Sequence, residues 1–158
     1  MTQENKPVIQ VKNLFQIGIV VRNLQKSMQL YEELLGIGDW VEMEIPSEIF
    51  DSLTYNGKPV EKACFLTGMT DVGSMQIELI QPVEGDLPYS DFLKEHGEGL
   101  HHVGHIHVPD IDTAVHDLEA RGFPCIFAGS TSGTKFAYVD MSRAMGVIVE
   151  LMEVHQAR

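Results

Sequence analysis

The chain has 158 residues, of which 44% are hydrophobic and 22% are charged, so it is long enough to form one ordinary globular domain with its own core. Its 11 lysines and arginines against 23 aspartates and glutamates give a formal charge of −12, which repels phosphate backbones and anionic membranes. Residues 1–10 carry no apolar run of signal-peptide length. We therefore expect a cytoplasmic protein with no nucleic-acid partner and no membrane partner.

The first predicted elements are a strand and a helix. Residues 14–21 (LFQIGIVV) are apolar and indicate a β-strand. Asn23 is a typical N-cap residue, and Gly36 is a typical helix-ending residue. Four apolar residues at helical spacing lie between them: Leu24, Met28, Tyr31 and Leu35. The pattern predicts a helix between Asn23 and Gly36.

Three short extended segments follow in this half, around residues 40–45, 60–66 and 75–81. The turn sequence Tyr55-Asn56-Gly57 separates the first two. The span 44–62 is longer than its counterpart later in the chain, and we interpret it as a lid or a substrate-facing wall. The order of elements in this half is βαβββ.

A connector and a second half complete the chain. Residues 83–99 contain a helical turn that starts at Pro88 and reaches Glu95. Residues 100–108 (LHHVGHIHV) then predict a strand, and Asp110 predicts the cap of a helix that ends at Gly122. The later strands are predicted at 125–127, 135–140 and 147–153, with a surface turn or a ligand-covering loop at 128–134.

The two halves repeat one plan, and this repeat decides the architecture. We predict an α+β fold of two βαβββ modules with pseudo-twofold symmetry, in a single domain over residues 1–158. Module one covers about 12–82, the connector 83–99, and module two about 100–154. A lone module would leave open sheet edges, so the two modules are expected to pack together and share a cleft.

The repeat also pairs residues that can bind a metal. Glu78 and Glu150 occupy equivalent positions in the last strand of each half, and Gln16 and His102 occupy equivalent positions in the first strand. A carboxylate among apolar neighbours is costly unless it is paired, hydrogen-bonded or bound to a metal. Each residue alone could be an ordinary strand residue, but the pairing favours one divalent metal per chain. Three oxygen donors and one nitrogen donor suit Zn, Ni, Co, Mn or Fe and do not choose among them.

At these residues the chain resembles the vicinal oxygen chelate superfamily, which includes glyoxalases, bleomycin-resistance proteins and extradiol dioxygenases. The resemblance covers about residues 14–154. It is strongest to methylmalonyl-CoA epimerases, at 76–82 (QIELIQP), 91–102 (DFLKEHGEGLHH) and 147–150 (VIVE). It implies a metal in the cleft, held by one residue from each of four strands, and a homodimer. Gln16 replaces the histidine of the epimerases and is similar to one branch of glyoxalase I.

The resemblance implies a metal-dependent isomerase or epimerase that acts through an enolate. Its small-molecule substrate would be an acyl-thioester or a related carbonyl compound. Glu150 is the first candidate for the proton-transferring base, Glu78 is the second, and Glu61 is a weaker one. The acidic charge leaves a smaller substrate than a CoA ester open. The alternatives are a glyoxalase-like lyase that acts on a thiol adduct and a metal-free protein that binds a drug or metabolite.

Histidines near His102 leave further alternatives. The run from His102 to Ile111 is one residue longer than the run from Gln16 to Leu24, which predicts a β-bulge after Gly104. The bulge could turn His105 or His107 into the cleft, although both could instead lie at the exposed end of the strand. Strand alternation predicts that His101 points away from the side of His102.

Overall fold

The computed structural model describes residues 6–155. Its strands are β1 (Gln16–Val20), β2 (Val41–Pro46), β3 (Ser52–Tyr55), β4 (Lys58–Pro59), β5 (Cys64–Val72), β6 (Met75–Glu84), β7 (Gly99–His107), β8 (Cys125–Ser130), β9 (Thr134–Asp140) and β10 (Ile148–Val154). Its helices are α1 (Leu24–Leu35), α2 (Pro88–His96), α3 (Ile111–Glu119) and α4 (Ser142–Met145), with a 3-10 turn, η2 (Ser47–Ile49). None of the helices in this described range is long and apolar enough to cross a membrane.

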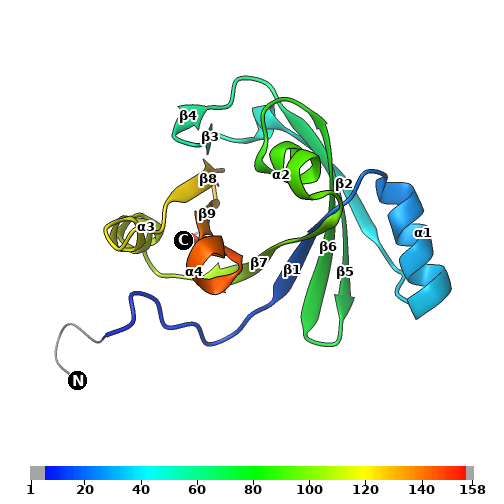
Figure 1. The fold of residues 1–158 in the computed structure, drawn as a ribbon, viewed down its shortest axis with the longest axis horizontal. Helices are drawn as coiled ribbons and strands as arrows, with labels where there is room; N and C mark the ends of the chain where they lie inside the picture. The colour runs from blue at the N-terminus through cyan, green and yellow to red at the C-terminus, as the bar shows by residue number, and fades with distance from the viewer. Residues whose placement is uncertain (1–5, 156–158) are drawn as a thin grey trace.

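All ten strands form one mixed sheet, in the order β2-β5-β6-β1-β7-β10-β9-β8-β3-β4. The sheet curls into a half-barrel with few helices, which confirms the predicted α+β class (Figure 1). At its centre, β1 and β7 are antiparallel neighbours. Each of them is also parallel to the last main strand of its own half, β1 to β6 and β7 to β10. The centre of the sheet therefore repeats the same arrangement in each half.

The two longer predicted helices form where their caps indicated. The Asn23 side chain accepts a 2.9 Å hydrogen bond from the Lys26 N–H at the start of α1, and Gly36 ends this helix with a φ of 67°. At the start of α3, Asp110 accepts a 2.9 Å hydrogen bond from the Thr113 N–H. Helix α1 packs on Ile77 and Leu79 of β6. These residues alternate with Glu78, so α1 covers the face of the sheet opposite to that carboxylate.

The span predicted as a lid or wall crosses from one end of the sheet to the other. We call residues 47–63 the crossing segment. Its two short strands, β3 and β4, form a hairpin, and β3 pairs antiparallel with β8 from Ser52 opposite Ser130 to Tyr55 opposite Phe127. Asn56 and Gly57 make the predicted turn, with φ values of 49° and 73°. The hairpin thus belongs to the first half by sequence and to the second half by hydrogen bonding.

Several predicted boundaries differ from the structure; α3, for example, ends at Glu119 and not at Gly122. The strand predicted at 60–66 begins only at Cys64, because Val60 closes the hairpin by donating its N–H to the Leu53 carbonyl at 2.9 Å. The loop predicted at 128–134 is shorter than expected, because β8 continues to Ser130 and β9 begins at Thr134. The remaining turn is closed by the Thr131 N–H, which donates to the Thr134 carbonyl at 2.8 Å.

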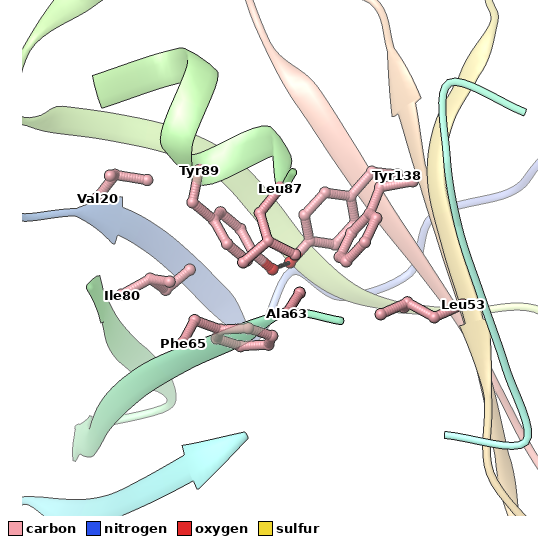
Figure 2. Packing of buried hydrophobic residues seen from close by; sticks show 9 residues of the cluster. Val20, Leu53, Ala63, Phe65, Ile80, Leu87, Tyr89 and Tyr138 are labelled. Carbon is pink, nitrogen blue, oxygen red and sulfur yellow. Dashed lines mark hydrogen bonds between the residues drawn. The ribbon is translucent and has the colours of Figure 1, made fainter. Parts of the chain in front are cut away.

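The concave face of the sheet is filled by buried side chains from both halves, from the crossing segment and from α2. We call them the concave-face cluster: Val20, Leu53, Ala63, Phe65, Ile80, Leu87, Tyr89, Phe127 and Tyr138 (Figure 2). Helix α2 lies between the two halves of the sheet (Figure 1). The predicted connector therefore covers the face on which Glu78 lies.

Candidate active site

The four predicted ligands come from the four central strands β6, β1, β7 and β10 and meet around one imidazole nitrogen. His102 Nε2 lies 3.3 Å from Gln16 Oε1, 3.6 Å from Glu78 Oε2 and 3.9 Å from Glu150 Oε2. The His102 side chain is completely buried, whereas the side chains of Glu78 and Glu150 are 14% and 11% exposed to solvent. We call these residues the donor cluster. Solvent reaches it from the side of the carboxylates.

Two glycines give the donor cluster its space. In the β1–β7 pairing, Gln16 lies opposite Gly104 and His102 lies opposite Gly18, so each long side chain faces a residue without one. A methyl group at Gly18 would overlap with the His102 ring. A methyl group at Gly104 would overlap with the Glu150 carboxylate and lie 2.8 Å from Gln16 Oε1. We did not predict this role, although the repeated spacing Gln16-x-Gly18 and His102-x-Gly104 is visible in the sequence.

A chain of amide hydrogen bonds orients Gln16. Its Nε2 donates to Gln76 Oε1 at 2.9 Å, and Gln76 Nε2 donates to Asp71 Oδ1 at 3.3 Å. Because the amide nitrogen of Gln16 is engaged with Gln76, its Oε1 faces His102 as an acceptor. Gln76 therefore supports the use of Gln16 as an oxygen donor.

Burial shifts the protonation of the donor cluster. It raises the pKa of Glu78 to about 8, and the negative charge of Glu150 adds to this shift. Burial also raises the pKa of Glu150 to about 7. The His105 N–H has the opposite, smaller effect on this pKa, because it donates to Glu150 Oε2 at 3.4 Å. Burial also lowers the pKa of His102 well below its ordinary value. The imidazole is therefore neutral beside two carboxyl groups that titrate near neutral pH.

The chemistry of this donor set fits a divalent cation. Two donors at ~2.1 Å from a common ion lie about 3.0 to 4.2 Å apart, depending on the angle between them. The three separations from His102 Nε2, between 3.3 and 3.9 Å, fall in this range. Across residues 6–155, no group of three or more His, Cys, Asp or Glu side chains has the geometry to hold a metal ion, so the fit depends on the chemistry of the four donors. Two ionised carboxylates and a neutral imidazole would balance the charge of a divalent ion.

His101 does not point away from the site, so the prediction from strand alternation is wrong. Its Nδ1 lies 3.1 Å from His102 Nδ1, and the residue is only 4% exposed. The reason is an irregular register in β7. Gly18 pairs with His102, but Ile19 pairs with Leu100, so His101 is an extra residue in the strand. One imidazole of the pair donates to the other and thereby orients the His102 ring.

The bulge predicted after Gly104 is confirmed. Val149 pairs with Val103, but Leu151 pairs with Ile106, so β7 again has one residue more than its partner. His105 adopts a φ of 57° at this point, and its N–H donates to Glu150. The His105 residue is half-buried. His107 is exposed, and its ring packs against Phe15 at a centroid distance of 6.3 Å.

The third candidate base, Glu61, lies at a different place. Its side chain is exposed and lines a cavity of about 590 Å³ together with Tyr55 and Asp91. The residues that line this cavity include none of the donor cluster. Glu61 therefore gains no support from the structure as a second base.

Two buried tyrosines beside the donor cluster were not predicted. Tyr138 pairs with Glu150 across β9 and β10, and its ring centroid lies 4.7 Å from that of His102. The hydroxyl groups of Tyr138 and Tyr89 are 2.8 Å apart (Figure 2). Each residue is 2% exposed. No pattern in the sequence brings Tyr89, which lies on α2, to this position.

Residues 15–139 match the family model of the Glyoxalase/Bleomycin resistance protein/Dioxygenase superfamily. The chain belongs to this superfamily, as its resemblance in sequence predicted. It is 28% identical over 145 residues to the uncharacterized protein YqjC of Bacillus subtilis, which covers 90% of this chain and 93% of YqjC. It is also 28% identical over 120 residues to the mitochondrial methylmalonyl-CoA epimerase of Mus musculus, covering 75% of this chain and 58% of that protein.

A solved structure supports the same fold. The methylmalonyl-CoA epimerase from Mycobacterium tuberculosis superposes with a TM-score of 0.66 at 20% sequence identity, over 99% of this chain and 97% of that chain. The predicted fold is thereby confirmed, because the alignment extends over both halves. Of the proteins named here, the two whose names give an activity, from Mus musculus and Mycobacterium tuberculosis, are methylmalonyl-CoA epimerases.

Proposed function

We propose that this protein is a metal-dependent isomerase that epimerises a carbonyl compound through an enolate, with an acyl-thioester or a related 2-substituted acid as its substrate. One observation carries the proposal. Two largely buried carboxylates from the two halves of the sheet, Glu78 and Glu150, lie 3.6 and 3.9 Å from Nε2 of the neutral and fully buried His102 imidazole. Two carboxylates at one site can remove a proton from a substrate and return it.

Gln16, Glu78, His102 and Glu150 are the residues that would hold the ion. Bound there, a divalent metal would act as a Lewis acid and increase the acidity of the C–H bond next to the substrate carbonyl. The His101–His102 contact would hold the imidazole with Nε2 toward the ion, and the Gln76 side chain would hold the Gln16 amide. Two ionised carboxylates and two neutral donors would balance the charge of a divalent cation.

The two carboxylates differ in how firmly they are held. Glu150 Oε2 accepts the His105 N–H, which stabilises its ionised form. Glu78 accepts no such hydrogen bond from the described residues. Because Glu78 is held less firmly, we propose it as the first proton-transferring group and Glu150 as both a ligand and the second proton-transferring group. This order reverses the one favoured by the sequence.

A glyoxalase-like lyase that acts on a thiol adduct is the second candidate. The observation in its favour is the Gln16 Oε1, which faces His102 where the resemblance to epimerases implies a histidine. Both candidates remove a proton next to a carbonyl group, and they differ in the carbon to which the proton returns. Product analysis separates them, because an epimerase returns the proton to the same carbon with inverted configuration, whereas a glyoxalase-like enzyme returns it to the neighbouring carbon and converts the thiol adduct into a thioester.

The first experiment measures metal content. The purified chain is stripped with a chelator, supplied with Zn, Ni, Co or Mn in turn, and analysed for bound metal after gel filtration. We expect close to one ion per chain. If the protein stays metal-free with every ion, the proposed isomerase is contradicted and a metal-free binding protein takes its place.

The second experiment follows proton transfer. Wild type, Glu78→Gln and Glu150→Gln are incubated in heavy water with acyl-thioesters and hydroxy-ketones, and deuterium next to the carbonyl is measured by NMR. Loss of a positioned base typically slows such a step by ~10² to 10⁴-fold. Exposed Asp117 on α3 provides a matched control, since Asp117→Asn removes one carboxylate far from β6 and β10. Equal exchange in all four proteins would place the base elsewhere.

A further inference from the structure

The row of side chains that runs from Glu78 to the outer edge of the sheet is apolar and exposed. Residues that pair across neighbouring strands share one face of a sheet. Glu78 of β6 pairs with Met69 of β5, and Met69 pairs with Val41 of β2. Met43, two residues further along β2, lies on the same face. Val41 and Met43 are 59% and 41% exposed, and Met69 is half-buried. We call Val41, Met43 and Met69 the open strip.

The charged residues of β2 lie on the other face of the sheet. Glu42 accepts a hydrogen bond from the Gln25 side chain of α1, so it points to the side that this helix covers. Glu44 is two residues further along the strand and points to the same side. The open strip therefore presents a neutral, apolar surface to solvent in a chain with a formal charge of −12.

The equivalent row in the second half of the sheet is closed. Glu150 pairs with Tyr138, and Tyr138 pairs with Phe127. Tyr55 of the crossing segment continues this row beyond Phe127. Tyr138 and Phe127 are 2% and 1% exposed, because both are packed in the concave-face cluster. A molecule bound at the donor cluster therefore has room to extend past Glu78 and has none past Glu150.

We propose that the open strip binds an apolar chain of the substrate, while the polar end of the same molecule is held at the donor cluster. The proposal rests on the isomerase function proposed above. Continuity with the donor cluster identifies the occupant, because a chain that passes Glu78 meets Met69 and then Val41. Strand β2 lies two strands from β6, a distance of about 9 to 10 Å. An extended chain of about eight carbons, with bonds of about 1.5 Å, covers this distance. The substrate class is thereby narrowed to carbonyl compounds with a long aliphatic chain.

The test measures how straight-chain carboxylates bind to the metal-loaded protein. Isothermal titration calorimetry gives the affinities of acetate, butyrate, hexanoate, octanoate and decanoate. Complete burial of a methylene strengthens binding about fourfold, and contact with the strip on one side buries about half of it, so we expect about twofold per methylene. Octanoate should then bind about tenfold or more tightly than acetate. The gain should stop near octanoate, because a longer chain passes the edge of β2.

The triple variant Val41→Thr/Met43→Gln/Met69→Gln makes the open strip polar with little change in side-chain size. Its affinity for acetate should equal that of the wild type, while the gain from acetate to octanoate should fall to about twofold or less. Leu30→Gln/Leu34→Gln is the matched control and should keep the wild-type gain, because both leucines are exposed on α1, which covers the opposite face. Circular dichroism and the melting temperature show whether each variant is folded. The double variant Val41→Thr/Met43→Gln, at exposed edge positions, repeats the test if the triple variant does not fold.

An equal gain in the wild type and in the folded variant would overturn the proposal, and so would a wild type that binds octanoate no better than acetate. Light scattering tests the other occupant. A triple variant that is monomeric where the wild type is dimeric, with no effect of chain length, would make the strip a contact between two copies.

The proposed function fails separately, through absence of bound metal or of solvent exchange in the wild type. If the protein holds no metal, the same titrations are run with neutral straight-chain alcohols. Their affinities should still rise with chain length in the wild type and lose this dependence in the triple variant. A wild type in which they do not rise would overturn the open strip as a binding surface.

Discussion

Removing metal while raising the pH should destabilise this protein because of Glu78 and Glu150. Their pKa values in the folded chain, about 8 and about 7, lie above the ordinary value of 4.5. A carboxyl group with a raised pKa in the folded state stabilises the fold at low pH. This contribution is lost as the pH rises through the folded pKa, because the unfolded chain releases its proton more readily. Stability of the metal-free protein should therefore decrease from pH 6.5 to pH 8.5.

The size of the loss follows from the two pKa values. Each pH unit over which a group stays protonated only in the folded chain changes the free energy of unfolding by about 1.4 kcal/mol. Between pH 6.5 and 8.5, Glu78 accounts for about 2 kcal/mol and Glu150 for about 1 kcal/mol by this linkage. For a chain of this length, a loss of about 3 kcal/mol lowers Tm by roughly 10 °C.

The assay is thermal unfolding followed by circular dichroism at half-unit pH steps, in chelator and with saturating Ni²⁺ or Co²⁺. Bound metal should remove the decrease, because it favours the ionised carboxylates. In chelator, Glu78→Gln should remove about two thirds of the decrease in Tm, because Glu78 accounts for about 2 of the roughly 3 kcal/mol. The variant Asp117→Asn, at an exposed site, should remove none of it. A Tm that is constant across this pH window in chelator would refute the reasoning. Titration of the buried His101 does not contribute in this pH range, because its pKa is lowered to about 4 and its protonation destabilises the fold only in acid.

Three further predictions concern the donor cluster and assembly. Gly18→Ala should displace the His102 ring, because the added methyl group overlaps with it, and should reduce metal content by at least tenfold while circular dichroism still reports a folded sheet. Metal analysis of His102→Ala should give well under one fifth of the wild-type content, and retention of the full amount would exclude this imidazole as a ligand. We expect a homodimer by light scattering, at twice the chain mass of 17.6 kDa; a monomer at working concentration would contradict this.

The repeat made the central sheet predictable. Equivalent positions in the two halves matched β1 with β7 and β6 with β10, and thereby paired Gln16 with His102 and Glu78 with Glu150. The caps Asn23 and Asp110 predicted the starts of α1 and α3 because their hydrogen bonds are local. These features depend on periodicity and on neighbours in sequence. Such patterns are accessible without coordinates.

Other parts of the site depend on contacts between distant residues. His101 lies on the same side as His102 because β7 has an extra residue where β1 has none, and periodicity within one strand does not reveal a partner's register. The pairing of β3 with β8 joins residues 78 positions apart, such as Ser52 and Ser130. The Tyr89–Tyr138 contact likewise requires α2 to lie over the concave face. None of these contacts has a local signal in the sequence.

The crossing segment also bears on how the chain folds. The β3–β4 hairpin completes the sheet edge at β8, although more than sixty residues separate the two along the chain. Closing a loop of this length is slow, because the chain loses conformational entropy before it gains the contacts between β3 and β8. Those contacts form only when both ends are already structured. The first half of the chain therefore emerges during synthesis with a hairpin that has no partner. We expect the two halves to gain stability together, in one cooperative transition, and a chain cut within residues 97–99 to yield two fragments that fold only when mixed.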